Sequence, residues 1–172
     1  MRSNTKILVQ TALGVALVTL CTMVIKIPIP STQGYVNVGD AMIFALAISL
    51  GKKRAALAGG VGACIADILL GAAIYAPATL IIKAVEGYVC GIIYENIKEK
   101  STLTGTIVSC LIGGLVMVVG YFGYEAILYG YIPAAAAIIP NLIQGGASLI
   151  IAVPLSKLLT KTVQKLEISS AA

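Results

Sequence analysis

Long apolar stretches alternate with short basic clusters along the whole chain. Ten of the twelve Lys and Arg residues fall in four clusters, which are Arg2 with Lys6, Lys52 to Arg54, Lys98 with Lys100, and Lys157 with Lys161 and Lys165. Each interval is long enough for a hydrophobic hairpin, because one membrane-spanning helix needs about 20 residues. Cytoplasmic loops retain Lys and Arg. The pattern therefore predicts an all-α fold, an integral membrane bundle of six transmembrane helices with cytoplasmic N and C termini.

Helix-breaking residues and charged turns set the expected limits of these six spans. We expect helices at about 6–27, 38–50, 55–70, 77–94, 103–128 and 134–159, in a single domain that covers residues 1–172. Outer loops are expected at 28–37, 71–76 and 129–133, and inner loops at 52–54 and 95–101. The second span is short for a full crossing. Either it begins below the membrane surface or the first outer loop fills part of that depth.

Composition supports a membrane protein and removes several other classes. Hydrophobic residues make up 59% of the chain, charged residues 11%, and the mean hydropathy is +0.99. The net charge of +5 follows from the basic loops, so it does not indicate nucleic-acid binding. The chain has no histidine and no phosphate-binding GxxxxGK[ST] motif. We therefore expect no enzyme activity, no catalytic residue and no cofactor.

The four cysteines give no sign of a metal site or a disulfide framework. All of them lie inside apolar runs, far apart in sequence, and no CxxC spacing is found; they are Cys21, Cys64, Cys90 and Cys110. We expect them to be small buried apolar residues, and we expect no bound metal.

Polar residues inside the predicted spans gather toward the outer side of the membrane. They are Asp40, Asp67, Lys83, Glu86, Glu125, Asn141 and Gln144. Ionisable groups in a membrane are costly unless they are paired or wetted, so this distribution predicts a water-filled pocket that opens outward. The inner halves of the spans lack such residues. That absence disfavours a channel or a self-sufficient facilitator, both of which need a continuous polar path.

Each polar residue also has a structural interpretation. For Lys83 this interpretation is an ion pair with Asp67 or Glu86 that fixes two helices together. Asp40 follows Gly39 and is a favourable N-cap for the second span. Hydrogen bonds across helices explain Asn141 and Gln144, and tyrosines such as Tyr129 and Tyr131 are common at membrane interfaces.

Three runs of sequence resemble one family of membrane proteins. They are residues 35–40 (YVNVGD), 62–75 (GACIADILLGAAIY) and 76–86 (APATLIIKAVE). Together with the chain length and topology, they are similar to the substrate-binding S components of energy-coupling-factor (ECF) vitamin transporters. The likeness is greatest to the riboflavin-transporter-like branch, which also contains hydroxymethylpyrimidine and pyridoxine carriers. The resemblance implies a compact six-helix bundle that holds its substrate near the outer surface.

The resemblance also implies partners. S components of this family sit in the cell membrane and join a transmembrane coupling subunit and two ATPase subunits. This agrees with the missing phosphate-binding loop. In the family, small residues of the first span dock on the coupling subunit, which points here to Ala12 and Ala16. We expect Gly14 to widen the same smooth face, because small residues let helices approach closely.

The polar map and the resemblance together predict a ligand site. Its expected residues are Tyr35, Asn37, Asp40, Tyr75, Lys83, Glu86, Tyr121, Glu125, Asn141 and Gln144. The two amides can donate and accept hydrogen bonds and Glu125 can accept them, which suits a neutral aminopyrimidine or hydroxypyridine. Hydroxymethylpyrimidine or a pyridoxine-like heterocycle is the first choice of ligand, and riboflavin is the alternative. A small intramembrane enzyme that uses Lys83, Glu86 or Asp67 is a weaker hypothesis, because no acid–base motif supports it.

Overall fold

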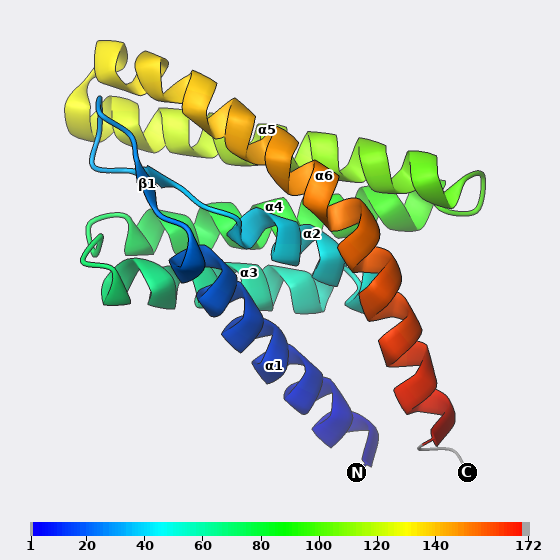
Figure 1. Cartoon of the computed structure of the whole chain (residues 1–172). Coiled ribbons are helices and arrows are strands. Elements are labelled where there is room, and N and C mark those ends of the chain that lie inside the picture. The colour runs from blue at the N-terminus through cyan, green and yellow to red at the C-terminus, as the bar shows by residue number, and fades with distance from the viewer. Residues whose placement is uncertain (1, 170–172) are drawn as a thin grey trace.

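The computed structural model describes residues 2–169, with side chains described for residues 4–165, and the chain is mostly helical (Figure 1). The helices are α1 (Arg2–Val24), α2 (Gly39–Leu50), α3 (Lys52–Leu69), α4 (Ala76–Ile97), α5 (Thr102–Tyr129) and α6 (Tyr131–Ser169). Between α1 and α2, the strands β1 (Ile27–Pro28) and β2 (Tyr35–Val36) form a small antiparallel hairpin. These elements confirm the mostly helical prediction.

Four of the described helices are long and apolar enough to cross a membrane. They include residues Asn4–Val24, Ala76–Ile97, Thr102–Tyr129 and Tyr131–Lys165. Helix α2 is apolar but only 12 residues long, and α3 carries three basic residues in its first turn. Large apolar side chains are exposed on the outer helices, with Leu8 at 69%, Ile127 at 84% and Ile132 at 86% of their surface. These surfaces suit contact with lipid, while the count of six spans stays a prediction.

Helix α2 lies at the centre of the bundle. It packs against α1, α3, α4 and α6, and most of its residues are buried. Ile43 and Phe44 are completely buried and belong to the main hydrophobic core. A helix that is apolar on every side is stable only when other helices surround it, which explains its central place. Its shortness leaves the space above its first residue, Gly39, to the segment 25–38.

The turns at two helix junctions are shorter than the sequence suggested. Residues Lys52–Arg54, expected as an inner loop, form the first turn of α3, and only Gly51 separates α2 from α3. Similarly, only Gly130 separates α5 from α6, within the loop expected at 129–133. Both glycines have positive φ values, +88° and +87°, a backbone conformation that residues with a side chain rarely adopt. A single glycine of this kind reverses the chain at each junction. The three basic residues after Gly51 are all compatible with a helix, so α3 begins directly after it.

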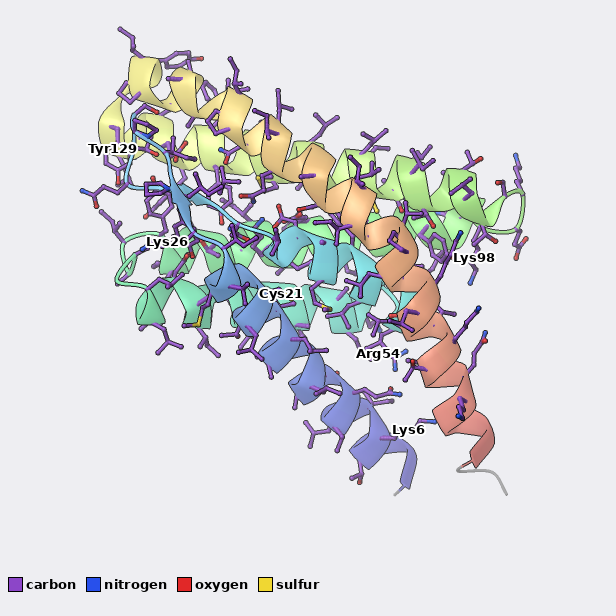
Figure 2. All side chains as sticks on the ribbon, in the orientation of Figure 1. Lys6, Cys21, Lys26, Arg54, Lys98 and Tyr129 are labelled. Atoms are coloured by element: carbon purple, nitrogen blue, oxygen red, sulfur yellow. The ribbon has the colours of Figure 1, made fainter. Side chains whose placement is uncertain are left out.

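The two ends of the bundle differ in composition. The start of α1 and the end of α6 lie toward one end, as do Lys6, Arg54 and Lys98 (Figures 1 and 2). We call it the basic end. Lys26 and Tyr129 lie toward the opposite end, which holds the β1–β2 hairpin and the turn at 70–75 (Figure 2). We call this the loop end. The basic end is the one expected to face the cytoplasm.

One expectation about α1 is wrong. Ala12 and Ala16 are exposed on one side of the helix, but Gly14 is buried on the other side. A Cβ atom at Gly14 would lie 3.1 Å from the Cβ of Ala58 and 3.3 Å from Leu46 Cδ1. Two residues along an α-helix correspond to a rotation of about 200°, so Gly14 cannot widen the Ala12–Ala16 face. Gly14 instead lets α1 pack closely against α3.

Candidate functional site

A cavity lies at the loop end, beneath the β1–β2 hairpin. It contains about 430 Å³ of space free of protein atoms, its opening included. Its walls come from α1, the hairpin, and helices α3 to α6. They are formed by Thr22, Ile29, Gly34, Tyr35, Asn37, Ala63, Asp67, Tyr75, Thr79, Lys83, Tyr121, Glu125, Asn141 and Gln144.

Most residues predicted from the sequence meet at this cavity. Eight of the ten line it, from Tyr35 in β2 to Gln144 in α6. The other two, Asp40 and Glu86, are completely buried behind it; both contact Lys83, and Asp40 also accepts a hydrogen bond from Gln144. Their expected direct contact with a ligand is therefore not supported by their positions.

Behind the cavity, Lys83 is held by two carboxylates. Its Nζ donates to Asp40 Oδ1 and lies 2.9 Å from Glu86 Oε2, and all three side chains are at most 2% exposed. Buried charges persist only when they are paired and hydrogen-bonded in this way. The expected pair with Glu86 is present. The alternative pair with Asp67 is not, because α2 brings Asp40 to the ammonium.

Asp40 does not cap α2. The N-cap position is Val38, and no side chain makes a capping hydrogen bond there. Asp40 instead lies in the first turn of the helix, where a negative charge is favourable. Its carboxylate contacts Lys83 of α4 and Gln144 of α6. Asp40 is therefore held by these side chains and not by a capping bond at the helix end.

Gln144 connects the charged cluster to the segment that follows the hairpin. Its Nε2 donates to Asp40 Oδ2 at 2.8 Å, and its Oε1 accepts from the backbone N–H of Asn37 at 2.8 Å. The side chain of Asn37 then accepts from the backbone N–H of Gly39 at 2.9 Å. Gln144 thus hydrogen-bonds across elements, as its structural interpretation proposed, and it fixes the backbone of Asn37 above α2.

Two tyrosines donate to carboxylates on opposite walls of the cavity. Tyr35 Oη donates to Asp67 Oδ1 at 2.5 Å, and Tyr75 Oη donates to Glu125 Oε1 at 3.0 Å. Burial raises the pKa of Tyr35 above its usual range, and the hydrogen bond to Asp67 raises it further. The phenol therefore remains protonated and acts as a donor.

Aromatic rings form one side of the cavity. The ring of Tyr75 lies with its centroid 6.2 Å from that of Tyr121, 5.7 Å from Tyr124 and 6.5 Å from Tyr129. The hydroxyls of Tyr121 and Thr79 are 3.0 Å apart, and Lys83 Nζ lies 5.5 Å from the Tyr121 ring centroid. Such a wall can pack against a flat heterocycle.

Several polar atoms at the cavity have no partner among the described residues. The side chain of Asn141 makes no hydrogen bond, although it is only 5% exposed. Asp67 Oδ2 and Glu125 Oε2 are buried and also lack a partner. Buried polar groups are almost always hydrogen-bonded, so three orphans around one cavity indicate a site for a polar ligand.

Sequence reasoning missed some of the lining. Asp67 belonged to the polar group of the outer halves but was not assigned to the site. Gly34 was also missed. It lies against the pair of Tyr75 and Glu125, because a Cβ there would be 3.0 Å from Glu125 Oε1 and 3.3 Å from Tyr75 Oη. Thr22 and Thr79 gave no signal, because threonine in a membrane helix often bonds only to its own backbone.

Metal binding and disulfides have no support in the part of the chain that the structure describes. No group of three or more His, Cys, Asp or Glu side chains there could hold a metal ion. All four cysteines are free, and Cys90 and Cys110 are buried.

A bundle of apolar helices with a polar ligand cavity at one end is the architecture of a membrane-embedded binding subunit. Residues 2–161 match the ECF-type riboflavin transporter S component family, and the chain belongs to that family. It is therefore a membrane protein of vitamin transport systems, and S components are not themselves enzymes.

Individual relatives extend over nearly the whole chain. An uncharacterised protein of Pyrococcus woesei is 37% identical over 147 residues, covering 85% of this chain and 96% of the relative. The thiamine precursor transporter HmpT of Lactococcus lactis subsp. cremoris is 30% identical over 161 residues, covering 92% and 90%. A solved S component of a bacterial ECF transporter has a TM-score of 0.70 at 21% identity, covering 93% of this chain and 98% of that one. This last likeness shows the S-component fold.

Proposed function

We propose that this protein binds a hydroxymethylpyrimidine-like vitamin precursor from outside the cell and delivers it to an ECF module for ATP-driven uptake. The module consists of a transmembrane coupling subunit and two ATPase subunits. Membership of the S component family supports the type of transport. The Lactococcus lactis relative is named as a thiamine precursor transporter, which supports a vitamin precursor as the ligand.

The observation that carries the proposal is the free amide of Asn141. It faces a cavity where a ring can lie against Tyr75 or Tyr121, and Glu125 offers a free acceptor oxygen nearby. Gln144 still has one N–H and one acceptor lone pair after its two hydrogen bonds. An aminopyrimidine with a hydroxymethyl group offers donors and ring nitrogen acceptors that match this set.

Riboflavin is the second candidate, because the family description names it. Its three fused rings and sugar-like chain need more space than one pyrimidine ring. The free space between the lining side chains is small, which favours the smaller ligand.

Calorimetric titration of the purified protein with hydroxymethylpyrimidine, pyridoxine and riboflavin tests the ligand. We expect hydroxymethylpyrimidine to bind most tightly. Tighter binding of riboflavin would make the second candidate correct, and tightest binding of pyridoxine would move the site to the hydroxypyridine class.

Ala16→Trp tests the assembly with partners. Ala12 and Ala16 are exposed on α1, where a bulky side chain would hold the coupling subunit away. We expect lost transport with unchanged ligand affinity, and Ile127→Trp, an exposed position on α5, serves as the control. Equal loss of binding and transport in Ala16→Trp would contradict the docking role.

Cysteine labelling in intact cells tests the orientation. In a variant without the four native cysteines, we expect Gln33→Cys at the loop end to react with a membrane-impermeant reagent. Lys53→Cys at the basic end should react only after the membrane is permeabilised. Labelling of residue 53 in intact cells would reverse the proposed orientation.

A further inference from the structure

The two tyrosine–carboxylate pairs of the cavity have the same construction. Tyr35 donates to one oxygen of Asp67, and Tyr75 donates to one oxygen of Glu125. In each pair the second oxygen, Asp67 Oδ2 or Glu125 Oε2, is buried and has no partner among the described residues. Each tyrosine therefore fixes its carboxylate through one oxygen and leaves the second able to accept from a ligand; the hydroxyls of Thr79 and Thr32 lie beside Asp67 and Glu125 respectively.

The two acceptors lie on different sides of α4. Asp67 comes from α3 and Glu125 from α5, and α4 packs against both helices. Both residues line the same cavity. A buried acceptor without a donor has lost its hydration and gained nothing in return. A ligand that carries N–H or O–H donors at two separate positions would satisfy both acceptors at once.

The cavity offers no free cation to an anionic ligand. Among its lining residues only Lys83 is positively charged, and Asp40 and Glu86 already bind its ammonium. Lys26 lies outside the lining; its Nζ donates to the backbone oxygen of Leu70 at 3.0 Å and lies 5.2 Å from the Tyr35 ring centroid. A phosphate group in the cavity would face two carboxylates in a site with little water, which is strongly unfavourable.

We propose that Asp67 and Glu125 are specificity-determining acceptors that select an unphosphorylated ligand with two hydrogen-bond donors. The amino group and the hydroxyl group of a hydroxymethyl aminopyrimidine are such donors. This inference rests on the proposed function, because it assumes that the transported heterocycle occupies this cavity. It adds Asp67 to the site and excludes phosphate esters as substrates.

Titration of the parent protein with alcohols and their phosphate esters tests the charge selection without any substitution. The probes are hydroxymethylpyrimidine and its phosphate ester, and riboflavin and its phosphate ester. We expect the free alcohol to bind at least about 100-fold more tightly than the ester. An ester that binds within about threefold of its alcohol would overturn the inference. Tighter binding of riboflavin than of hydroxymethylpyrimidine would overturn the proposed ligand. The affinity of riboflavin relative to its phosphate ester would then still decide whether the cavity excludes phosphate.

Asp67→Asn and Glu125→Gln test the two acceptors separately. Each keeps the size of the side chain but replaces a free carboxylate oxygen, so we expect a loss of about 5- to 150-fold in affinity for hydroxymethylpyrimidine. The ratio of the affinity for the alcohol to the affinity for its phosphate ester should become smaller in both variants. Lys98→Gln, which removes an exposed charge at the basic end, is the control and should change neither value. Variants that unfold like the parent and keep its affinity and its ratio would overturn the role of that acceptor.

Discussion

The two ends of this protein are held together by different means. At the loop end, polar side chains from distant parts of the chain meet: Asp40 from α2, Lys83 from α4 and Gln144 from α6. The charged side chains of this cluster are almost completely buried. At the basic end, the ion pair between Lys52 and Glu95 has a length of 2.7 Å, but its side chains are 28% and 36% exposed.

Close helix packing at the basic end comes from missing side chains. A Cβ at Gly91 would lie 2.5 Å from the Cα of Lys52, and a Cβ at Gly87 would lie 2.9 Å from the backbone oxygen of Ala55. The backbones of α3 and α4 are thus in contact there. Close backbone contact continues toward the loop end, where a Cβ at Gly60 would lie 2.6 Å from the backbone oxygen of Leu80. The comparison teaches that backbone contact holds α3 against α4 along its length, while the loop end adds a network of buried polar side chains around the cavity.

Lys83→Met should produce the largest loss of stability. It removes the ammonium between Asp40 and Glu86 and leaves two buried carboxylates without a counter-charge. Breaking a buried ion pair from one side typically costs about 3–5 kcal/mol in the free energy of unfolding. Unfolding in mixed detergent micelles, followed by circular dichroism, measures the effect.

Lys52→Met is the matched control for this prediction. The Lys52–Glu95 pair is partly exposed to solvent, and pairs near the surface contribute little to stability. We expect its effect to be far smaller than that of Lys83→Met. Equal effects of the two substitutions would show that the buried cluster does not stabilise the loop end more than the surface pair stabilises the basic end.

Gly91→Ala tests the other half of the comparison. The added methyl group meets the Lys52 backbone, which cannot move aside as a flexible side chain would. Overpacking of this kind costs about 1–3 kcal/mol in the free energy of unfolding. Gly145→Ala is the control, because its nearest neighbour, Gly114 Cα, would be at an ordinary 3.7 Å. A parent-like Gly91→Ala would contradict the close contact of α3 with α4.

Local patterns predicted the helices well and the junctions poorly. Each of the six described helices overlaps an apolar run in the sequence. Such runs predict helices because a segment buried in lipid or in the core must be apolar along its length. The prediction of a loop at 52–54 was wrong, since basic residues mark a membrane side but do not break a helix. Only Gly51, with its positive φ, ends α2 there.

The candidate site was predictable as a set but not as a network. The outer-half position of the polar residues indicated a common pocket, and eight of the ten proposed residues line it. The partners were not predictable. Asp40 reaches Lys83 across 43 positions of sequence, and Gln144 reaches the Asn37 backbone across 107. No local spacing encodes contacts that depend on how helices pack.

Asn141→Ala should weaken ligand binding while leaving stability unchanged. The amide makes no hydrogen bond to any described residue, so its removal should cost only the proposed bond to the ligand. That loss is typically about 1–3 kcal/mol, or roughly 5- to 150-fold in affinity. Ser148→Ala, also buried on α6 but outside the cavity, is the control for calorimetric titration. Parent-like binding by Asn141→Ala would place the ligand elsewhere.

Gly123→Ala should give the smallest effect and the opposite sign. Gly123 lies inside α5 near the loop end, and nothing lies within 4 Å of a Cβ built there. Without a steric cost, alanine is the better helix former by about 0.5–1 kcal/mol. The same substitution that destabilises Gly91 should therefore slightly raise the free energy of unfolding at Gly123. If Gly123→Ala were as harmful as Gly91→Ala, the damage would come from alanine in these helices generally. Close backbone contact at Gly91 would then not explain the difference between the two glycines.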